Sequence, residues 1–196
     1  DLALVLRAGA LPAPLTVLEE RSIGPGLGAD SIAAGQIAAI VGIILVIFYI
    51  VLSYGIYGAM ASAGLLVNLM LILGALSLIQ ATLTLPGIAG IVLTMGMAVD
   101  SNVLIFERIR EELRRGRGVR DAIKAGYSRA ISTIMDANLT TLIASILLYI
   151  FGSGPVRGFS VTLGIGIITS LFTAILFTRF LIVLWINAKK PKTLVI

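Results

Sequence analysis

Long apolar runs alternate with short polar segments along most of the chain. Five runs of about 20 residues carry almost no charge, at about 32–52, 63–82, 86–106, 131–151 and 159–186. A helix of about 20 residues is long enough to cross a hydrocarbon core about 30 Å thick. The pattern therefore predicts an all-α membrane protein that forms a five-helix transmembrane bundle.

Small residues and one proline support helices that pack closely within such a bundle. Pro86 stands at the start of the third run, where it suits the first turn of a helix. Glycines recur inside the runs, as at Gly87, Gly90, Gly164 and Gly166, and small residues allow helix backbones to approach closely in lipid. We therefore expect a packed bundle and not a single anchoring helix.

The composition agrees with a membrane protein and excludes several kinds of functional site. Hydrophobic residues make up 58% of the 196 residues and charged residues 13%, and the mean hydropathy is +1.06. These values lie outside the range of soluble domains. The chain has no cysteine and no histidine, so thiolate metal sites, disulfides and a histidine base are excluded. We expect no metal and no organic cofactor, and proton chemistry must use Asp, Glu, Tyr, Lys or Arg.

The first 30 residues differ from the rest of the chain. A short apolar run over Leu2–Leu6 is followed by Pro12, Pro14 and Pro25 and by several glycines. This segment is too short and too polar to span a membrane, and it lacks the basic start of a signal peptide. We predict that residues 1–30 are the C-terminal remnant of an extramembrane domain with its linker.

Basic residues predict the orientation in the membrane. The segment 107–135 carries eight of them, and the tail 188–196 adds three lysines, whereas the loops 83–85 and 152–158 carry only Arg157. Loops rich in Lys and Arg stay in the cytoplasm. We therefore place the 107–135 loop and the C-terminus inside, and residues 1–30 outside. The net charge of +5 does not predict nucleic-acid binding, because no basic patch contains interleaved aromatic residues.

The charged loop is predicted to be a helical hairpin over residues 107–130. Apolar residues recur at helical spacing on both sides of Gly116 and Gly118, which break the helix. Glu111 with Arg114 or Arg115, and Arg108 with Glu112, have the spacing of helical ion pairs. We expect an amphipathic hairpin on the inner leaflet, or alternatively a docking surface for a cytoplasmic partner. Arg179, near the end of the fifth run, is expected to reach the inner headgroups.

Asp100 is the candidate functional residue, because it lies inside an apolar run. It precedes Phe106 by six residues and so lies about 9 Å inside the cytoplasmic boundary. A charge within a membrane helix is costly, and such carboxylates often relay protons. Burial favours the neutral form, so the group can gain and lose a proton as water access changes. The alternative is a structural hydrogen bond between helices.

The fourth run places polar residues at a similar depth. Asn138 follows Ile131 by seven residues and lies about 10 Å inside the same boundary. If the third and fourth helices touch, one level of the bundle is polar. The residues predicted to line it beside Asp100 are Ser101, Asn102, Asp136, Asn138, Thr140 and Thr141. For Asp136 the alternative to a role in this polar level is a purely structural role, because it lies nearer the membrane interface.

Three stretches resemble the membrane region of the SecD family, in the resistance–nodulation–division superfamily. "LRAGALPAPL" and "EERSIGPGLG" (6–15 and 19–28) are similar to the family's junction between periplasmic domain and second membrane helix. "GMAVDSNVLIFERIREELRRG" (96–116) is similar to its fourth helix, apart from Ser101, where the family often has Ala. "AISTIMDANLTTLIASILLYIFGSGPVRGFSVTLGIGI" (130–167) is similar to its fifth and sixth helices.

This resemblance implies a function and partners that composition does not show. It implies a subunit of the Sec protein-export machinery in the bacterial inner membrane, with residues 1–30 periplasmic and the C-terminus cytoplasmic. The subunit would use the proton motive force to promote translocation of secreted polypeptides, without enzymatic catalysis. Its partners would be a SecF-like membrane subunit, the translocon channel, the translocating polypeptide and the lipid bilayer.

The resemblance also assigns a role to Asp100 and leaves two alternatives open. Asp100 falls on the family's proton-pathway aspartate, and the chain would supply half of a twelve-helix bundle completed by the SecF-like subunit. The basic partner in the proton pathway would belong to that other half. The alternatives are a proton-coupled exporter of drugs or lipids from the same superfamily and a structural membrane scaffold.

Overall fold

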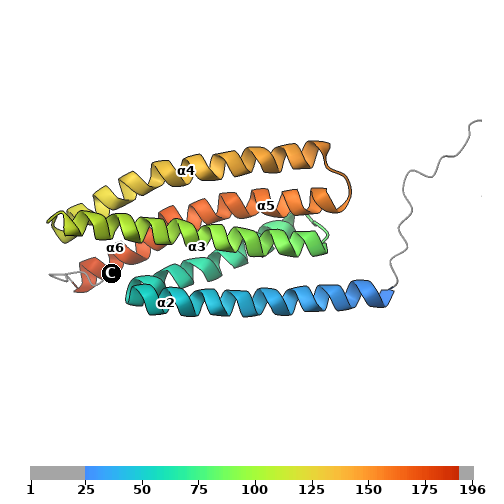
Figure 1. The fold of residues 1–196 in the computed structure, drawn as a ribbon, viewed down its shortest axis with the longest axis horizontal. Coiled ribbons are helices and arrows are strands. Elements are labelled where there is room, and N and C mark those ends of the chain that lie inside the picture. Colours follow the sequence, from blue (N-terminus) through green and yellow to red (C-terminus); the bar gives the residue numbers. More distant parts are fainter. Residues whose placement is uncertain (1–24, 190–196) are drawn as a thin grey trace, which may run out of the picture.

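The computed structural model describes residues 25–189, and every regular element in that range is a helix (Figure 1). The elements are α2 (Pro25–Leu78), α3 (Leu85–Arg114), α4 (Val119–Phe151), α5 (Pro155–Phe172), η1 (Thr173–Phe177) and α6 (Thr178–Lys189). Most of the predicted extramembrane segment 1–30 and of the tail 188–196 lies outside the described residues. The last residues of the predicted segment belong to α2, which begins at Pro25, and their place outside the membrane stays a prediction.

The described residues contain four helical segments long and apolar enough to cross a membrane, and not the five separate helices that the sequence predicted. They are Asp30–Leu78, Leu85–Arg114, Val119–Phe151 and Pro155–Lys189. The difference lies in α2, which contains both of the first two apolar runs. The connection predicted at 53–62 is helical except at Gly55, because its other residues are compatible with a helix.

A sharp bend at Gly55 divides α2 into two arms that run back along each other (Figure 1). Gly55 has φ 53° and ψ −124°, a backbone conformation that side chains with a Cβ rarely adopt. Tyr54 and Tyr57 flank the bend and pack against Phe106 of α3, with ring centroids 5.4 and 6.1 Å apart. Tyr57 also meets Trp185 of α6 at 5.7 Å. The bend is therefore held in the core by aromatic contacts.

The helix before the turn between α2 and α3 ends earlier than the sequence predicted. The second apolar run extends to Thr82, but α2 ends at Leu78. The hydroxyl of Thr84 caps α3 by accepting a hydrogen bond from the backbone N–H of Gly87 (3.2 Å). Pro86 occupies the first turn of α3, which confirms that part of the sequence analysis.

The charged hairpin is built from continuations of α3 and α4, and the predicted break between them is confirmed. Gly116 has φ 82° and Gly118 precedes the first residue of α4. The apolar faces of the hairpin pack against each other, because Ile109, Ile123 and Tyr127 are buried in one core cluster. The position of this hairpin on the inner leaflet stays a prediction.

The last predicted run, 159–186, forms three consecutive elements without a loop. The π-helix η1 joins α5 to α6, and the resulting rod extends from Pro155 to Lys189. The end of α6, the bend within α2 and the tip of the α3–α4 hairpin lie at the same end of the bundle (Figure 1). All the long helices therefore run roughly parallel or antiparallel to one axis.

Glycines allow the central helices α3 and α5 to pack with little space between them. A Cβ at Gly166 of α5 would lie 2.5 Å from the side chain of Thr94, and one at Gly90 of α3 would collide with Thr162. Both threonines are fully or almost fully buried. This close contact of small residues fixes the position of α3, the helix that carries Asp100.

Candidate functional site

Asp100 lies on the outward face of α3, next to the buried side of the same helix. Ala98, Ser101 and Asn102 are buried, whereas Asp100 is exposed in this chain. Within residues 25–189, its carboxylate has neither a hydrogen-bond donor nor a cation as a partner. An uncompensated carboxylate in an apolar span is costly in lipid, so Asp100 needs water, a proton or a further protein surface.

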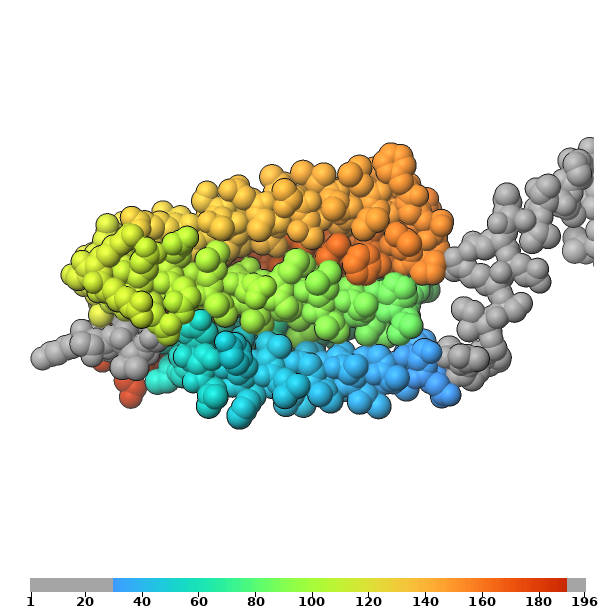
Figure 2. Space-filling view, viewed as in Figure 1, coloured from blue at the N-terminus to red at the C-terminus, as the bar shows by residue number. Residues whose placement is uncertain are grey.

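The carboxylate opens into a pocket of about 190 Å³ between α3 and α4. The wall from α3 consists of Met97, Asp100, Ser101 and Leu104. The wall from α4 consists of Thr133, Ile134, Ala137, Asn138 and Thr141. Figure 2 shows a furrow between α3 (green) and α4 (yellow to orange) on this face. The two helices thus meet at the depth of Asp100, as the polar residues of both runs indicated.

Four of the seven residues predicted to form one polar level line this pocket: Asp100, Ser101, Asn138 and Thr141. The other three face elsewhere. Asn102 is buried and its amide donates to the carbonyl of Ala98 (3.2 Å). Asp136 and Thr140 are exposed on a different side of α4. Helical rotation explains this division. Positions 134, 138 and 141 lie on the face of α4 toward the pocket, and positions 136 and 140 lie together on another face.

Two amides near the pocket retain unused hydrogen-bonding capacity. The Nδ2 of Asn138 donates to the carbonyl of Ile134 (2.8 Å), but its Oδ1 is buried without a partner. The Oδ1 of Asn102 is also buried without a partner. Buried acceptors of this kind usually bind water or a donor from another chain. Of these two amides, Asn138 is the one that lines the pocket beside Asp100.

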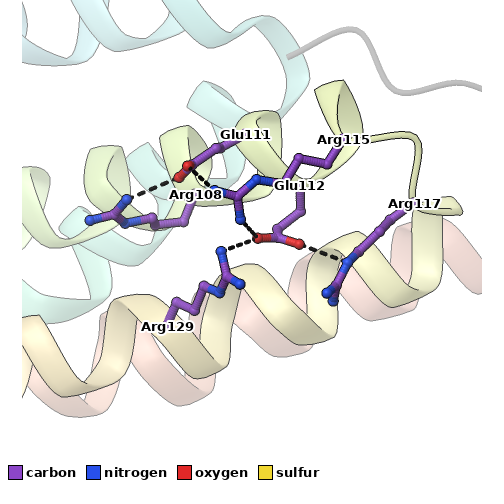
Figure 3. Close-up of polar contacts among 6 residues, drawn as sticks. All are labelled: Arg108, Glu111, Glu112, Arg115, Arg117 and Arg129. Carbon is purple, nitrogen blue, oxygen red and sulfur yellow. Dashed lines mark hydrogen bonds and ion pairs between the residues drawn. The ribbon is translucent and has the colours of Figure 1, made fainter.

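A second polar cluster lies at the tip of the same two helices and centres on Glu112 (Figure 3). Its side chain is fully buried, and its Oε1 lies 2.8 Å from Arg115 and 2.5 Å from Arg129. The Nε of Arg117 lies 2.8 Å from Oε2 as an ion pair, without the alignment of a hydrogen bond. Arg129 belongs to α4, so this carboxylate links both arms of the hairpin.

Glu112 was predicted from the sequence only as a partner of Arg108, and its observed partners are Arg115, Arg117 and Arg129. Arg108 pairs with Glu111 (2.9 Å) and not with Glu112, whereas the Glu111–Arg115 pair is confirmed at 2.7 Å. The signal for Glu112 was present, because it follows Ile109 by three residues and so falls on the buried stripe of α3. A carboxylate on such a stripe requires a partner from the facing helix.

Glu111 is the solvent-facing counterpart of Glu112. The hydrogen bond from Arg108 and the charge of Arg115 hold the pKa of Glu111 below its usual value. Its ion pairs therefore persist at neutral pH and are lost only when the pH falls through that lowered pKa. Because the group is exposed, we expect these pairs to stabilise the hairpin only slightly.

Arg179 on α6 contacts the hairpin as well. Its guanidinium lies 5.3 Å from the ring centroid of Tyr127, a cation–π contact with a residue of α4. Arg179 is nevertheless exposed, so the predicted reach toward headgroups remains a prediction. Within residues 25–189, no group of three or more carboxylates is arranged to bind a metal ion.

Comparisons with known proteins agree on one family. Residues 10–188 match the family described as "Protein export membrane protein SecD/SecF, C-terminal". The chain is 59% identical over 194 residues to a protein translocase subunit SecD of Rickettsia conorii. It is 53% identical over 196 residues to the corresponding subunit of Rhodobacter capsulatus. The alignments cover 99% and 100% of this chain but only 38% and 35% of the relatives.

One solved structure matches the fold closely. It is the crystal structure of SecDF, a translocon-associated membrane protein from Thermus thermophilus, with a TM-score of 0.87 and 50% sequence identity. The match covers 97% of this chain and 27% of the SecDF chain. The chain thus spans little more than a third of its curated relatives and about a quarter of the solved neighbour.

Proposed function

The chain belongs to the SecD/SecF family of protein export membrane proteins, and we propose that it is the membrane part of a SecD-like subunit that uses the proton motive force. The observation that carries this proposal is Asp100, an unpaired carboxylate in an apolar span that opens into a partly polar pocket. Protonation and deprotonation of such a group change the packing of the helix that carries it. In this proposal a proton gradient takes the place of a cofactor, and no covalent reaction is catalysed.

We propose further that a SecF-like membrane subunit completes the site. Asp100 is exposed in this chain, and the face of α4 that lines the pocket continues into exposed apolar residues, as at Ala144 and Leu148. A second helical subunit against this face would exclude lipid from the pocket and could supply a basic group to Asp100. The chain would then form half of a twelve-helix bundle beside the translocon channel, and the periplasmic part of the subunit would contact the translocating polypeptide.

The test of this function is replacement within a working export system. We expect a SecD protein in which the matching region is exchanged for this chain to restore secretion of a reporter in cells depleted of SecD. The same exchange carrying Asp100→Asn is the matched control and should fail. If the exchange inserts at normal levels and restores no secretion, the assignment to Sec export is contradicted.

We propose that the chain crosses the inner membrane five times, with α2 crossing twice through its bend at Gly55. The hairpin tip and the end of α6 would lie in the cytoplasm, since that end carries most of the Lys and Arg residues. The turn at 152–154, at the opposite end of the bundle, would then be periplasmic (Figure 1).

Cysteine labelling tests this topology. Gly118 and Ser153 are exposed, and neither has a positive φ, unlike Gly116 and Gly154. In intact cells, an impermeant thiol reagent should label Ser153→Cys and not Gly118→Cys. Permeabilisation should expose both cysteines equally, which controls for reactivity. Labelling of Gly118→Cys from outside would reverse the orientation.

A further inference from the structure

We propose that the cytoplasmic end of the bundle contains a binding site for an anionic phospholipid between the first turns of α4 and the helix α6. The proposal rests on the topology proposed above, with this end of the bundle in the cytoplasm, and it is independent of the export role. It rests on a pocket of about 270 Å³ lined by Arg120, Ile123, Lys124, Arg179, Val183, Ile186 and Asn187. Three cations and three aliphatic residues thus share one small cavity.

The three cations of this pocket lack anionic partners. Within residues 25–189, neither Arg120 nor Lys124 nor Arg179 forms an ion pair with a carboxylate. Arg179 contacts only the ring face of Tyr127, which leaves its positive charge uncompensated. Asp121 is the carboxylate on the same turn of α4, but it lines the neighbouring cavity with Lys124 and does not enter this one. The pocket therefore has an excess of positive charge.

The cations are also placed where the helix itself does not favour them. Arg120 and Lys124 lie near the N-terminus of α4, which carries the positive end of the helix dipole. No side chain caps this terminus, because Gly118 is the preceding residue. The other cations of the hairpin, such as Arg115, Arg117 and Arg129, are instead paired with Glu112. The cations of the pocket are therefore left at this end to bind an anion.

The apolar side of the pocket selects a lipid over a small anion. Val183 and Ile186 line it from α6, and exposed residues continue this surface toward the middle of the bundle, at Leu176 and Phe180. A lipid phosphate held by the cations would leave its acyl chains free to lie along this surface. Basic pockets next to membrane helices on the cytoplasmic side bind anionic headgroups in this way.

Binding of short-chain lipids to the purified full-length protein in a neutral detergent tests the proposal. We expect dioctanoylphosphatidylglycerol to bind saturably in microscale thermophoresis, and dioctanoylphosphatidylcholine to bind at least tenfold more weakly. Inorganic phosphate should not compete at millimolar concentration. Equal binding of the two lipids would mean that the pocket binds acyl chains without recognising the headgroup charge. Competition by phosphate would mean that it is a site for small anions. Either result overturns the proposal.

Charge variants locate the site. A Lys or Arg near an anionic lipid surface strengthens binding about fivefold, so Arg120→Gln/Lys124→Gln should weaken phosphatidylglycerol binding about thirtyfold. The control Arg114→Gln/Lys189→Gln removes two cations from the same end of the bundle, outside the pocket, and should change binding less than fivefold. The single variant Lys124→Gln should bind phosphatidylglycerol about fivefold more weakly. It replaces the double variant in the test if the double variant is unstable. Equal losses in pocket and control variants would indicate a diffuse surface charge and contradict a defined site.

Discussion

Asp100→Asn in the full-length protein is expected to leave folding and membrane insertion intact and to abolish proton-dependent secretion. Asparagine matches the shape of the neutral acid, and the pocket around position 100 is open, so packing should not change. A fixed charge would be costly at this depth, and a group that stayed neutral could be replaced by Asn without loss. An aspartate is required only if the group changes its charge during the cycle.

The energy available from this charge change is sufficient to drive a conformational step. Moving one elementary charge through the membrane potential releases about 2.3 kcal/mol per 100 mV. That amount shifts a two-state equilibrium more than tenfold. Because α3 packs tightly against α5 through Gly90 and Gly166, we expect a movement of α3 to be passed on to its neighbours.

The measurement is secretion of a reporter at equal expression, with and without a protonophore. Asp136→Asn is the matched control, since Asp136 is an exposed carboxylate on α4 that lies slightly nearer the interface and does not line the pocket. We expect this control to secrete as the parent does. Normal secretion by Asp100→Asn would make Asp100 a structural residue and favour a scaffold.

Glu112→Gln is expected to have the largest effect on the stability of the bundle. The side chain of Glu112 is fully buried, and three arginines converge on it from both arms of the hairpin. Removing one partner of a buried ion pair costs about 3–5 kcal/mol when the remaining charge stays buried. Here the arginines are roughly half exposed and can turn to water, so we expect a loss of about 2–3 kcal/mol.

Unfolding in detergent and limited trypsin digestion measure this loss. We expect Glu112→Gln to unfold at a lower temperature and to be cleaved faster between Arg114 and Gly118. Glu111→Gln is the matched control one residue away, and because Glu111 is exposed we expect the loss of its ion pairs to change stability only slightly. If both variants lose the same stability, the buried carboxylate does not hold the hairpin together.

The sequence predicted the helices of this protein better than their connections. Each apolar run does become helical, because runs of this length with so few charges can satisfy their backbone in lipid only as helices. Signals read from single residues were also reliable where they act locally, as with Pro86 at the start of α3 and Gly116 and Gly118 between α3 and α4. The bend at Gly55 could not be distinguished from a loop, since it requires the aromatic contacts of distant residues.

The candidate site shows the same division. Asp100 is identifiable from sequence alone, because a carboxylate in an apolar run is costly whatever surrounds it. Its neighbours are not, because they depend on how α4 is rotated against α3. That rotation brings Asn138 and Thr141 into the pocket and turns Asp136 and Thr140 away from it.

The sequence by itself therefore determined that this is a helical membrane protein with a carboxylate, Asp100, well inside an apolar run. Hydrophobicity, length and charge are properties of each segment, and they act before any two helices meet. Only the tertiary structure decided that Glu112 is buried among three arginines, that Arg120, Lys124 and Arg179 share a pocket, and that Asp100 is open on one side. Each of these facts depends on the register and rotation of two helices, which side-chain packing sets across many residues at once.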